Sequence, residues 1–93
     1  MKTIYLVITE EKWADENYQD IVAFENFDNA KEYFDNEINK LSQPNGLISE
    51  LKERGYEESD YCIHRDIDMN TYSVYEYNGD YNAYIYITEK TLM

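Results

Sequence analysis

The sequence predicts an α+β domain, in which a single antiparallel sheet of about five strands carries one amphipathic helix and a short second helix on one face. Two observations predict this class: strand-like alternation near both ends of the chain, and an apolar stripe at helical spacing between them. The 93 residues have the length of one domain, so we expect residues 1–93 to share a single core. Hydrophobic residues make up 43% of the chain, enough to build that core.

The first part of the chain predicts a β-hairpin. In residues 3–9, consecutive apolar side chains point alternately to opposite sides, as in a strand with both faces covered. Residues 10–20 are polar and acidic, and a β-branched and aromatic run resumes at residues 21–24. We therefore expect two paired strands joined by a long loop that carries the single tryptophan, Trp13.

The middle of the chain predicts two helices. Asp28 is in position to cap the first helix, whose apolar side chains recur at steps of three and four. These residues form one stripe: Ala30, Tyr33, Phe34, Ile38 and Leu41. Pro44-Asn45-Gly46 ends this helix, and the apolar residues that follow predict a short second helix ending near Gly55.

The last third of the chain predicts a three-stranded meander. Successive side chains along residues 61–68 point to opposite faces, and the polar residues on one of them indicate a strand with one solvent-exposed face. Two tyrosine-rich runs, residues 72–77 and 81–89, then flank Asn78-Gly79, which is typical of a two-residue hairpin turn. The chain is therefore expected to end in a hairpin whose register is set by this turn.

This register divides the tyrosines between the two faces of the sheet. Tyr72 opposes Ile85 and faces the core, whereas the opposite face carries Tyr75, Tyr77, Tyr84 and Tyr86, with Asp80 beside them. Tyrosine combines a large ring with a hydrogen-bonding hydroxyl, a combination that interfaces favour. We expect these side chains to meet a partner; the alternative is that they cover the second face against the segment around Trp13.

The charge of the chain restricts its partners. Twenty Asp and Glu residues against eight Lys and Arg give a formal charge of -12 and a pI near 4.2. Phosphates would be repelled before contact, so we expect no direct binding to nucleic acid or to an anionic membrane. A basic protein is the partner that this charge favours.

Several other classes lack support in the sequence. The apolar run at residues 4–8 is too short for a signal peptide or a membrane span, so we expect a cytoplasmic protein. A single cysteine and a single histidine exclude an internal disulfide and a Cys/His zinc cluster. Three glycines are too few for a phosphate-binding loop, and we expect no cofactor and no enzymatic activity.

Two local patterns suggest a metal or a nucleophile. Cys62, His64, Asp66 and Asp68 share one side of a predicted strand, but neighbours on that side lie about 7 Å apart, too far for a direct thiol–imidazole hydrogen bond. A solvated strand face is the favoured interpretation, with a metal site or nucleophilic catalysis as alternatives.

The second pattern, Asp66-x-Asp68-x-Asn70, matches the opening of an EF-hand calcium loop. Thr71 stands where the loop needs glycine and Tyr77 where it needs a bidentate glutamate. Asp and Asn are also good turn formers, so a turn between two strands is the favoured interpretation.

The acidic residues are distributed along the whole chain, and the longest stretch without one is residues 38–49. The acid is therefore expected on the folded surface. One interpretation is that the acidic residues serve solubility or salt tolerance, or that they only reflect the base composition of the genome. The other is that carboxylates and phenolic oxygens stand where phosphates would dock on a basic groove.

In its small size, strong acidity, abundance of Tyr and Asn, and lack of catalytic motifs, the chain resembles phage- and mobile-element-encoded inhibitors of bacterial defence nucleases, including DNA-mimicking anti-CRISPR and anti-restriction proteins. This resemblance implies an inhibitor that occupies the nucleic-acid groove of a CRISPR or restriction nuclease. The alternative is a small immunity-type or regulatory binding module whose acidity mainly serves solubility.

The residues expected to contact a basic partner fall into two groups. The acidic group clusters around the third predicted strand: Glu57, Glu58, Asp60, Asp66 and Asp68. The second group lies on the tyrosine-rich hairpin: Tyr75, Tyr77, Asp80 and Tyr84.

Overall fold

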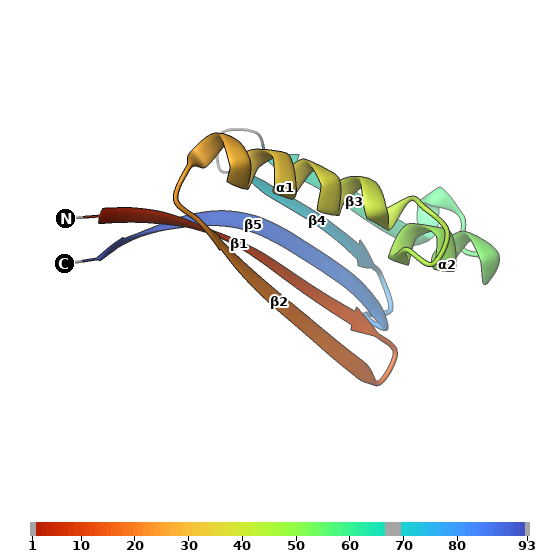
Figure 1. Cartoon of the computed structure of the whole chain (residues 1–93). Helices are drawn as coiled ribbons and strands as arrows, with labels where there is room; N and C mark the ends of the chain where they lie inside the picture. Colours follow the sequence, from red (N-terminus) through yellow and green to blue (C-terminus); the bar gives the residue numbers. More distant parts are fainter. Residues whose placement is uncertain (1, 67–69, 93) are drawn as a thin grey trace.

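The computed structural model describes residues 2–66 and 70–92, and it confirms the predicted class: a five-stranded antiparallel sheet with two helices (Figure 1). In chain order the elements are β1 (Lys2–Trp13), β2 (Glu16–Phe24), α1 (Phe27–Leu41), α2 (Leu47–Glu53), the 3-10 helix η1 (Glu58–Asp60), β3 (Tyr61–Asp66), β4 (Thr71–Glu76) and β5 (Tyr81–Leu92). The strand order is β2-β1-β5-β4-β3. Among the described helices, none has the length and apolar character needed to cross a membrane.

The two longest strands form the centre of the sheet. β1 and β5 pair along their whole length, from Lys2 opposite Leu92 to Trp13 opposite Tyr81. Twelve residues at about 3.4 Å each give strands of about 40 Å, which explains the elongated shape of 49 × 24 × 21 Å. The two ends of the chain consequently lie together at one end of the molecule (Figure 1).

The expected long loop at residues 10–20 is wrong. β1 continues to Trp13 and β2 begins at Glu16, so the connection is the tight turn at Ala14 and Asp15, with a positive φ of 54° at Ala14. The polar residues stay in the ladder because β1 is bonded to β2 on one side and to β5 on the other. Backbone pairing therefore overrides the low strand propensity of acidic side chains.

Helix α1 begins earlier than predicted. The N-cap is Asn26, whose Oδ1 accepts hydrogen bonds from the backbone N–H groups of Asp28 at 2.7 Å and Asn29 at 3.3 Å. Asp28, the predicted cap, lies in the first turn, where its charge is favourable next to the helix dipole. The apolar stripe is confirmed, because four of its members are buried: Ala30, Phe34, Ile38 and Leu41.

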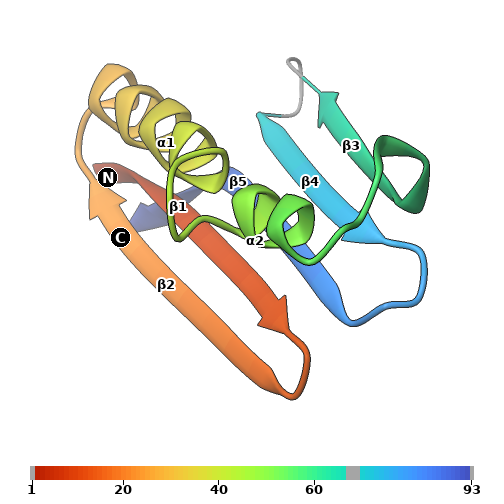
Figure 2. The same cartoon turned by 90° about the vertical axis from the view of Figure 1, so that its right-hand side faces the viewer.

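Gly46 fixes how closely α2 follows α1. A Cβ atom at this position would lie 2.1 Å from the carbonyl oxygen of Lys40 and 2.5 Å from that of Leu41, so a side chain would force the backbone apart. The close connection brings the buried face of α2 into the same core as α1, on the same side of the sheet (Figure 2).

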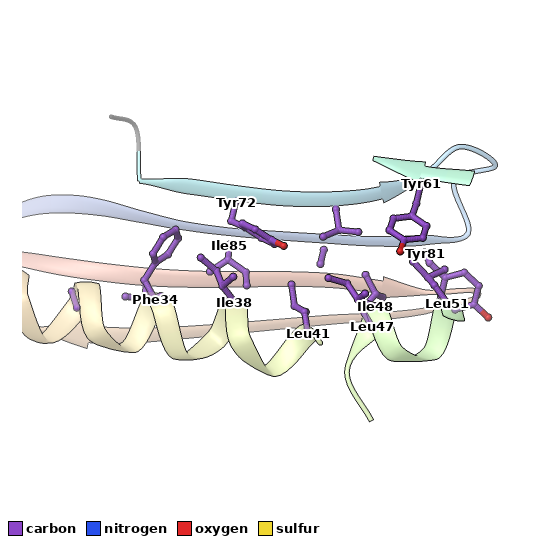
Figure 3. Packing of buried hydrophobic residues seen from close by; sticks show 14 residues of the cluster. Phe34, Ile38, Leu41, Leu47, Ile48, Leu51, Tyr61, Tyr72, Tyr81 and Ile85 are labelled. Atoms are coloured by element: carbon purple, nitrogen blue, oxygen red, sulfur yellow. The ribbon is translucent and has the colours of Figure 1, made fainter. Parts of the chain in front are cut away.

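The core lies between the helices and one face of the sheet (Figure 3). Tyr72 opposes Ile85 and Val74 opposes Ala83, as the hairpin register predicts, and all four are buried beneath the helices. Both helices lie on this side, and the opposite face of the sheet is open (Figure 2).

The β4–β5 turn differs from the expected two-residue turn. The Gly79 N–H donates to the Glu76 carbonyl at 2.9 Å, and Gly79 has a φ of 84° while Asn78 keeps a negative φ. A two-residue type I′ turn needs positive φ at both central residues, so the turn spans residues 76–79 instead. Tyr77 and Asp80 consequently belong to the connection and not to the ladder.

Candidate functional site

Three connections that are distant in sequence meet at the end of the sheet opposite the chain termini (Figure 1, right). The β1–β2 turn is bonded to the β4–β5 connection, because the Ala14 N–H donates to the Asp80 carbonyl at 2.6 Å. The Lys12 ammonium also donates to the Gly79 carbonyl at 3.0 Å. The Tyr77 N–H then donates to the Asp60 carbonyl at 3.1 Å, which joins η1 to the same end.

These connections carry a group of carboxylates that we call the acidic end: Asp15, Glu16, Glu57, Glu58, Asp60 and Asp80. All six residues are exposed. Within the described residues, none of the six is within ion-pair distance of a basic side chain. The ion pairs that are present all lie elsewhere: Lys2–Glu25, Lys31–Asp35, Lys40–Glu37, Arg54–Glu50 and Arg65–Asp35. Lys12 reaches a backbone carbonyl of this end, but its ammonium group is not ion-paired with any of the six carboxylates.

Two of these carboxylates are also fixed by local hydrogen bonds. Glu57 and Asp60 form a reciprocal capping box around η1, in which the Glu57 N–H donates to Asp60 Oδ2 at 2.8 Å and the Glu57 side chain accepts from the Asp60 backbone. Such a box orders a short helical turn and orients both side chains. Glu58, between them, is left to face solvent.

The buried carboxylate of Glu76 stabilises the β4–β5 turn. Glu76 is 2% exposed, and its Oε2 accepts hydrogen bonds from the backbone N–H groups of Asn78 and Gly79. Loss of hydration and the nearby Glu76 carboxylate together raise the pKa of the Tyr56 phenol. The turn that presents Tyr77 and Asp80 is thus anchored to the core.

The predicted tyrosines lie on the open face of the sheet. Tyr75 and Tyr84 are 44% and 42% exposed and point away from the buried Tyr72, and Tyr77, in the connection that follows β4, is 65% exposed. Their rings contact one another in pairs: the centroids of Tyr75 and Tyr77 are 6.0 Å apart, and those of Tyr84 and Tyr86 are 4.9 Å apart. Trp13 does not cover them, because it packs on the helix side against Tyr81.

The structure divides the predicted acidic group. Glu57, Glu58 and Asp60 belong to the acidic end, whereas Asp66 lies at the far end of β3, about 17 Å along the strand at about 3.3 Å per residue. Asp68 lies outside the described residues. The sequence-adjacent acids therefore face different ends of the sheet.

Cys62 and His64 lie on β3, next to β4 in the sheet. Cys62 pairs across the strands with Tyr75 and His64 with Ser73. The Cys62 side chain raises the pKa of the Tyr75 phenol, chiefly through a hydrogen bond. In residues 2–66 and 70–92, no three His, Cys, Asp or Glu side chains are grouped as ligands of a metal ion.

Sequence reasoning missed a cleft of about 630 Å³ between the β1–β2 hairpin and α1. Its walls include the side chains of Glu11, Trp13, Glu16, Asp20, Tyr33 and Glu37. The hairpin residues were expected in a loop, so the alternation that places Thr9, Glu11 and Trp13 on one side of β1 was not recognised.

The cleft disfavours the ionised forms of two of its side chains, Glu11 and Tyr33. Burial raises the pKa of the Glu11 carboxyl, the charge of Glu37 raises it further, and the Trp13 side chain opposes this shift. Tyr33 donates a hydrogen bond to Asp20 Oδ2 at 3.2 Å. Loss of hydration, together with Glu37 and Asp20, holds the pKa of the Tyr33 phenol well above its usual range.

No protein-family model, curated protein or solved structure matches this chain. The candidate site is therefore defined by its geometry and charge: the acidic end, the exposed tyrosines beside it and the cleft behind the β1–β2 turn.

Proposed function

We propose that this protein is a nucleic-acid-mimicking inhibitor, which binds the basic groove of a CRISPR or restriction nuclease in the cytoplasm and blocks its access to DNA or RNA. The observation that carries the proposal is the acidic end: six exposed carboxylates, held by three hydrogen-bonded connections and, among the described residues, without an ion-pair partner. The protein acts by binding and not by catalysis.

Rigidity is what distinguishes a phosphate mimic from an acidic tail. Flexible side chains lose conformational entropy on binding, whereas carboxylates on a fixed backbone are already in place. The five strands span about 19 Å at about 4.8 Å per gap, so the acidic end forms a row that an extended basic groove can follow.

The charge of the acidic end also explains why a basic partner is favoured. Like charges that lack counter-charges repel one another and weaken the compact state. Arginine and lysine side chains of a nucleic-acid groove would relieve this repulsion and would steer the encounter over several ångströms. The exposed tyrosines on the open face, above all Tyr77 beside Asp80, would supply aromatic anchors next to the charges.

The open face of the sheet supports a second candidate function, an immunity-type or regulatory binding module. Besides Tyr75, Tyr77 and Tyr84, this face exposes Ile21, which is 54% accessible. A partner that docks mainly on these apolar groups would bind with little dependence on salt, because burial of apolar surface is not screened.

Capture followed by competition tests the proposal. The immobilised protein is exposed to a nuclease-treated bacterial lysate, and bound proteins are eluted with duplex DNA or with RNA. We expect a basic nucleic-acid-binding protein that nucleic acid displaces. A captured protein that holds its nucleic acid and this protein together in a ternary complex would contradict the decoy mechanism.

Two triple variants make the test specific. Asp15→Asn, Glu58→Gln and Asp80→Asn remove charge from the acidic end and leave the capping residues Glu57 and Asp60 intact. The matched control neutralises three exposed acids elsewhere: Glu25→Gln, Glu32→Gln and Glu89→Gln. Capture should be lost by the first triple variant and kept by the second; equal capture by both would refute the acidic end as the contact surface.

A further inference from the structure

The cleft between the β1–β2 hairpin and α1 has more negative charge than its surroundings neutralise. Four carboxylates line it, Glu11, Glu16, Asp20 and Glu37, against the single ammonium group of Lys40. Lys40 pairs with Glu37 at 3.0 Å, and in the described part of the chain no basic side chain pairs with Glu11. The cleft therefore offers a half-buried carboxylate to an incoming cation.

A buried hydroxyl in the wall of the cleft also lacks a partner. Thr9 is 2% exposed and lines the cleft, and its Oγ1 has no hydrogen-bond partner among the described residues. Buried polar atoms in folded proteins are almost always hydrogen-bonded, so such an atom requires an explanation. A ligand with several donors, seated in the cleft, would satisfy it.

Aromatic residues also line the cleft, which the α1–α2 connection closes on another side. Trp13, Tyr18 and Tyr33 line it together with the carboxylates. A guanidinium group is planar, offers five donors in a fixed fork, and stacks on aromatic rings, whereas an ammonium group is a compact, strongly hydrated point charge. Carboxylates, a hydroxyl and aromatic faces in one cleft are thus the chemistry that recognises a guanidinium group.

We propose that this cleft binds the guanidinium group of an arginine side chain presented by the basic partner. This inference rests on the proposed function, and it names the cleft as the place where one partner arginine is inserted behind the acidic end. Burial and the nearby charge of Glu37 both disfavour the ionised Glu11 carboxylate, and an inserted cation would offset both effects.

The single tryptophan makes the proposal directly measurable, because Trp13 lies in the cleft wall. Trp13 fluorescence is followed during titration with N-acetyl-arginine amide, N-acetyl-lysine amide or magnesium chloride at constant ionic strength. We expect a saturable change with the arginine compound and affinity lower by about fivefold or more for the lysine compound. No saturable change with arginine, or an equal response to lysine or magnesium, would overturn the proposal.

Variants test which groups are responsible. Glu11→Gln should weaken arginine binding by about tenfold or more, because a charge-assisted hydrogen bond is lost. Thr9→Val removes the hydroxyl and should weaken binding severalfold, while Thr9→Ser, which keeps it, should not. Glu32→Gln is the control, with the same charge change on α1 but outside the cleft. Equal weakening by Glu11→Gln and Glu32→Gln would show a general charge effect and contradict the proposal.

The failure of this inference differs from failure of the proposed function. If a nucleic-acid-displaced partner is captured equally by wild type, Glu11→Gln and Thr9→Val, the inhibitor proposal stands and the arginine cleft is refuted. If the arginine compound binds but no such partner is captured, the cleft stands and the inhibitor proposal fails. Agmatine binding more tightly than N-acetyl-arginine amide would assign the cleft to a free small molecule and refute the insertion of a partner side chain.

Discussion

The helix-covered region and the acidic end of this protein contain the same residue types, tyrosine and glutamate, but bury them in one region and expose them in the other. Under the helices, Tyr72 is buried against the apolar core and Glu76 is buried and bonded to backbone. At the acidic end and on the open face beside it, Tyr77 and Glu58 are exposed. The difference teaches that neither the number of acids nor the number of tyrosines indicates function; their partners in the fold do.

The acids of the helices make the same point. On α1 and α2, Asp35, Glu37 and Glu50 pair with lysine or arginine side chains. None of the six carboxylates of the acidic end does so in the part of the chain that the structure describes. The carboxylates behind the formal charge of -12 consequently differ from region to region in how many are ion-paired. Three of the six acids on α1 and α2 are ion-paired, whereas none of the six at the acidic end is ion-paired among the described residues.

The largest effect that separates the two regions is expected from the tyrosines. Tyr72→Ala should lower the free energy of unfolding by about 3 kcal/mol or more, because it opens a cavity beneath α1. Tyr75→Ala and Tyr84→Ala should each cost less than about 1 kcal/mol, because both rings are largely exposed. Thermal and urea unfolding of the three variants measure this difference, and equal large losses would show that both faces are buried.

A smaller contrast is expected between two glutamates of the same end. Glu76→Ala should cost about 2 kcal/mol, because the N–H groups of Asn78 and Gly79 lose their acceptor. Glu58→Ala should change stability by less than about 0.5 kcal/mol. Urea unfolding gives both values; a neutral Glu76→Ala would mean that the β4–β5 turn does not depend on the buried carboxylate.

Removing carboxylate charge should stabilise the folded protein when the charge lies at the acidic end, but not when it lies at the control positions. The triple variant of the acidic end should raise the free energy of unfolding by about 1 kcal/mol at low salt, because uncompensated repulsion is relieved. The control triple variant removes equal charge but also breaks the Lys2–Glu25 pair, so we expect no gain. Unfolding at low and high salt checks this, and the gain should shrink as salt screens the repulsion.

The smallest effect concerns Glu11 and depends on pH. Burial raises its pKa above the usual 4.5, so the ionised carboxylate is less stable in the folded chain than in the unfolded chain. Glu11→Gln should therefore stabilise the protein by less than about 1 kcal/mol at pH 7. The gain should shrink as the pH falls through the raised folded pKa and vanish below the unfolded value near 4.5, where Glu11 is protonated in both states. A stability difference that is constant from neutral pH to about pH 4 would contradict this assignment.

Local patterns in the sequence were sufficient to predict much of the fold. The apolar stripe of α1 and the register that pairs Tyr72 with Ile85 are decided by neighbouring residues, and both are confirmed. The pairing of β1 with β5 joins the two ends of the chain, and no local signal encodes it. That pairing also keeps residues 10–13 in a strand, which is why a long loop was wrongly expected there.

The candidate site was less predictable than the fold, because it is assembled from distant segments. Sequence proximity grouped Glu57 with Asp66, but β3 carries the chain from one end of the sheet to the other between them. Asp15 lies near Asp80 because the adjacent Ala14 N–H donates to the Asp80 carbonyl, which joins two turns that are far apart in sequence. The exposed tyrosines were predictable because their direction follows from the hairpin register alone.

The central claim is that the acidic end occupies the place of nucleic acid on a basic partner. It is tested most directly by measuring the Kd of the captured partner for its DNA or RNA at increasing concentrations of this protein. We expect a competitive increase in apparent Kd, which is lost with the acidic-end triple variant and kept with the control triple variant. An unchanged Kd, or an equal increase with both triple variants, would contradict it.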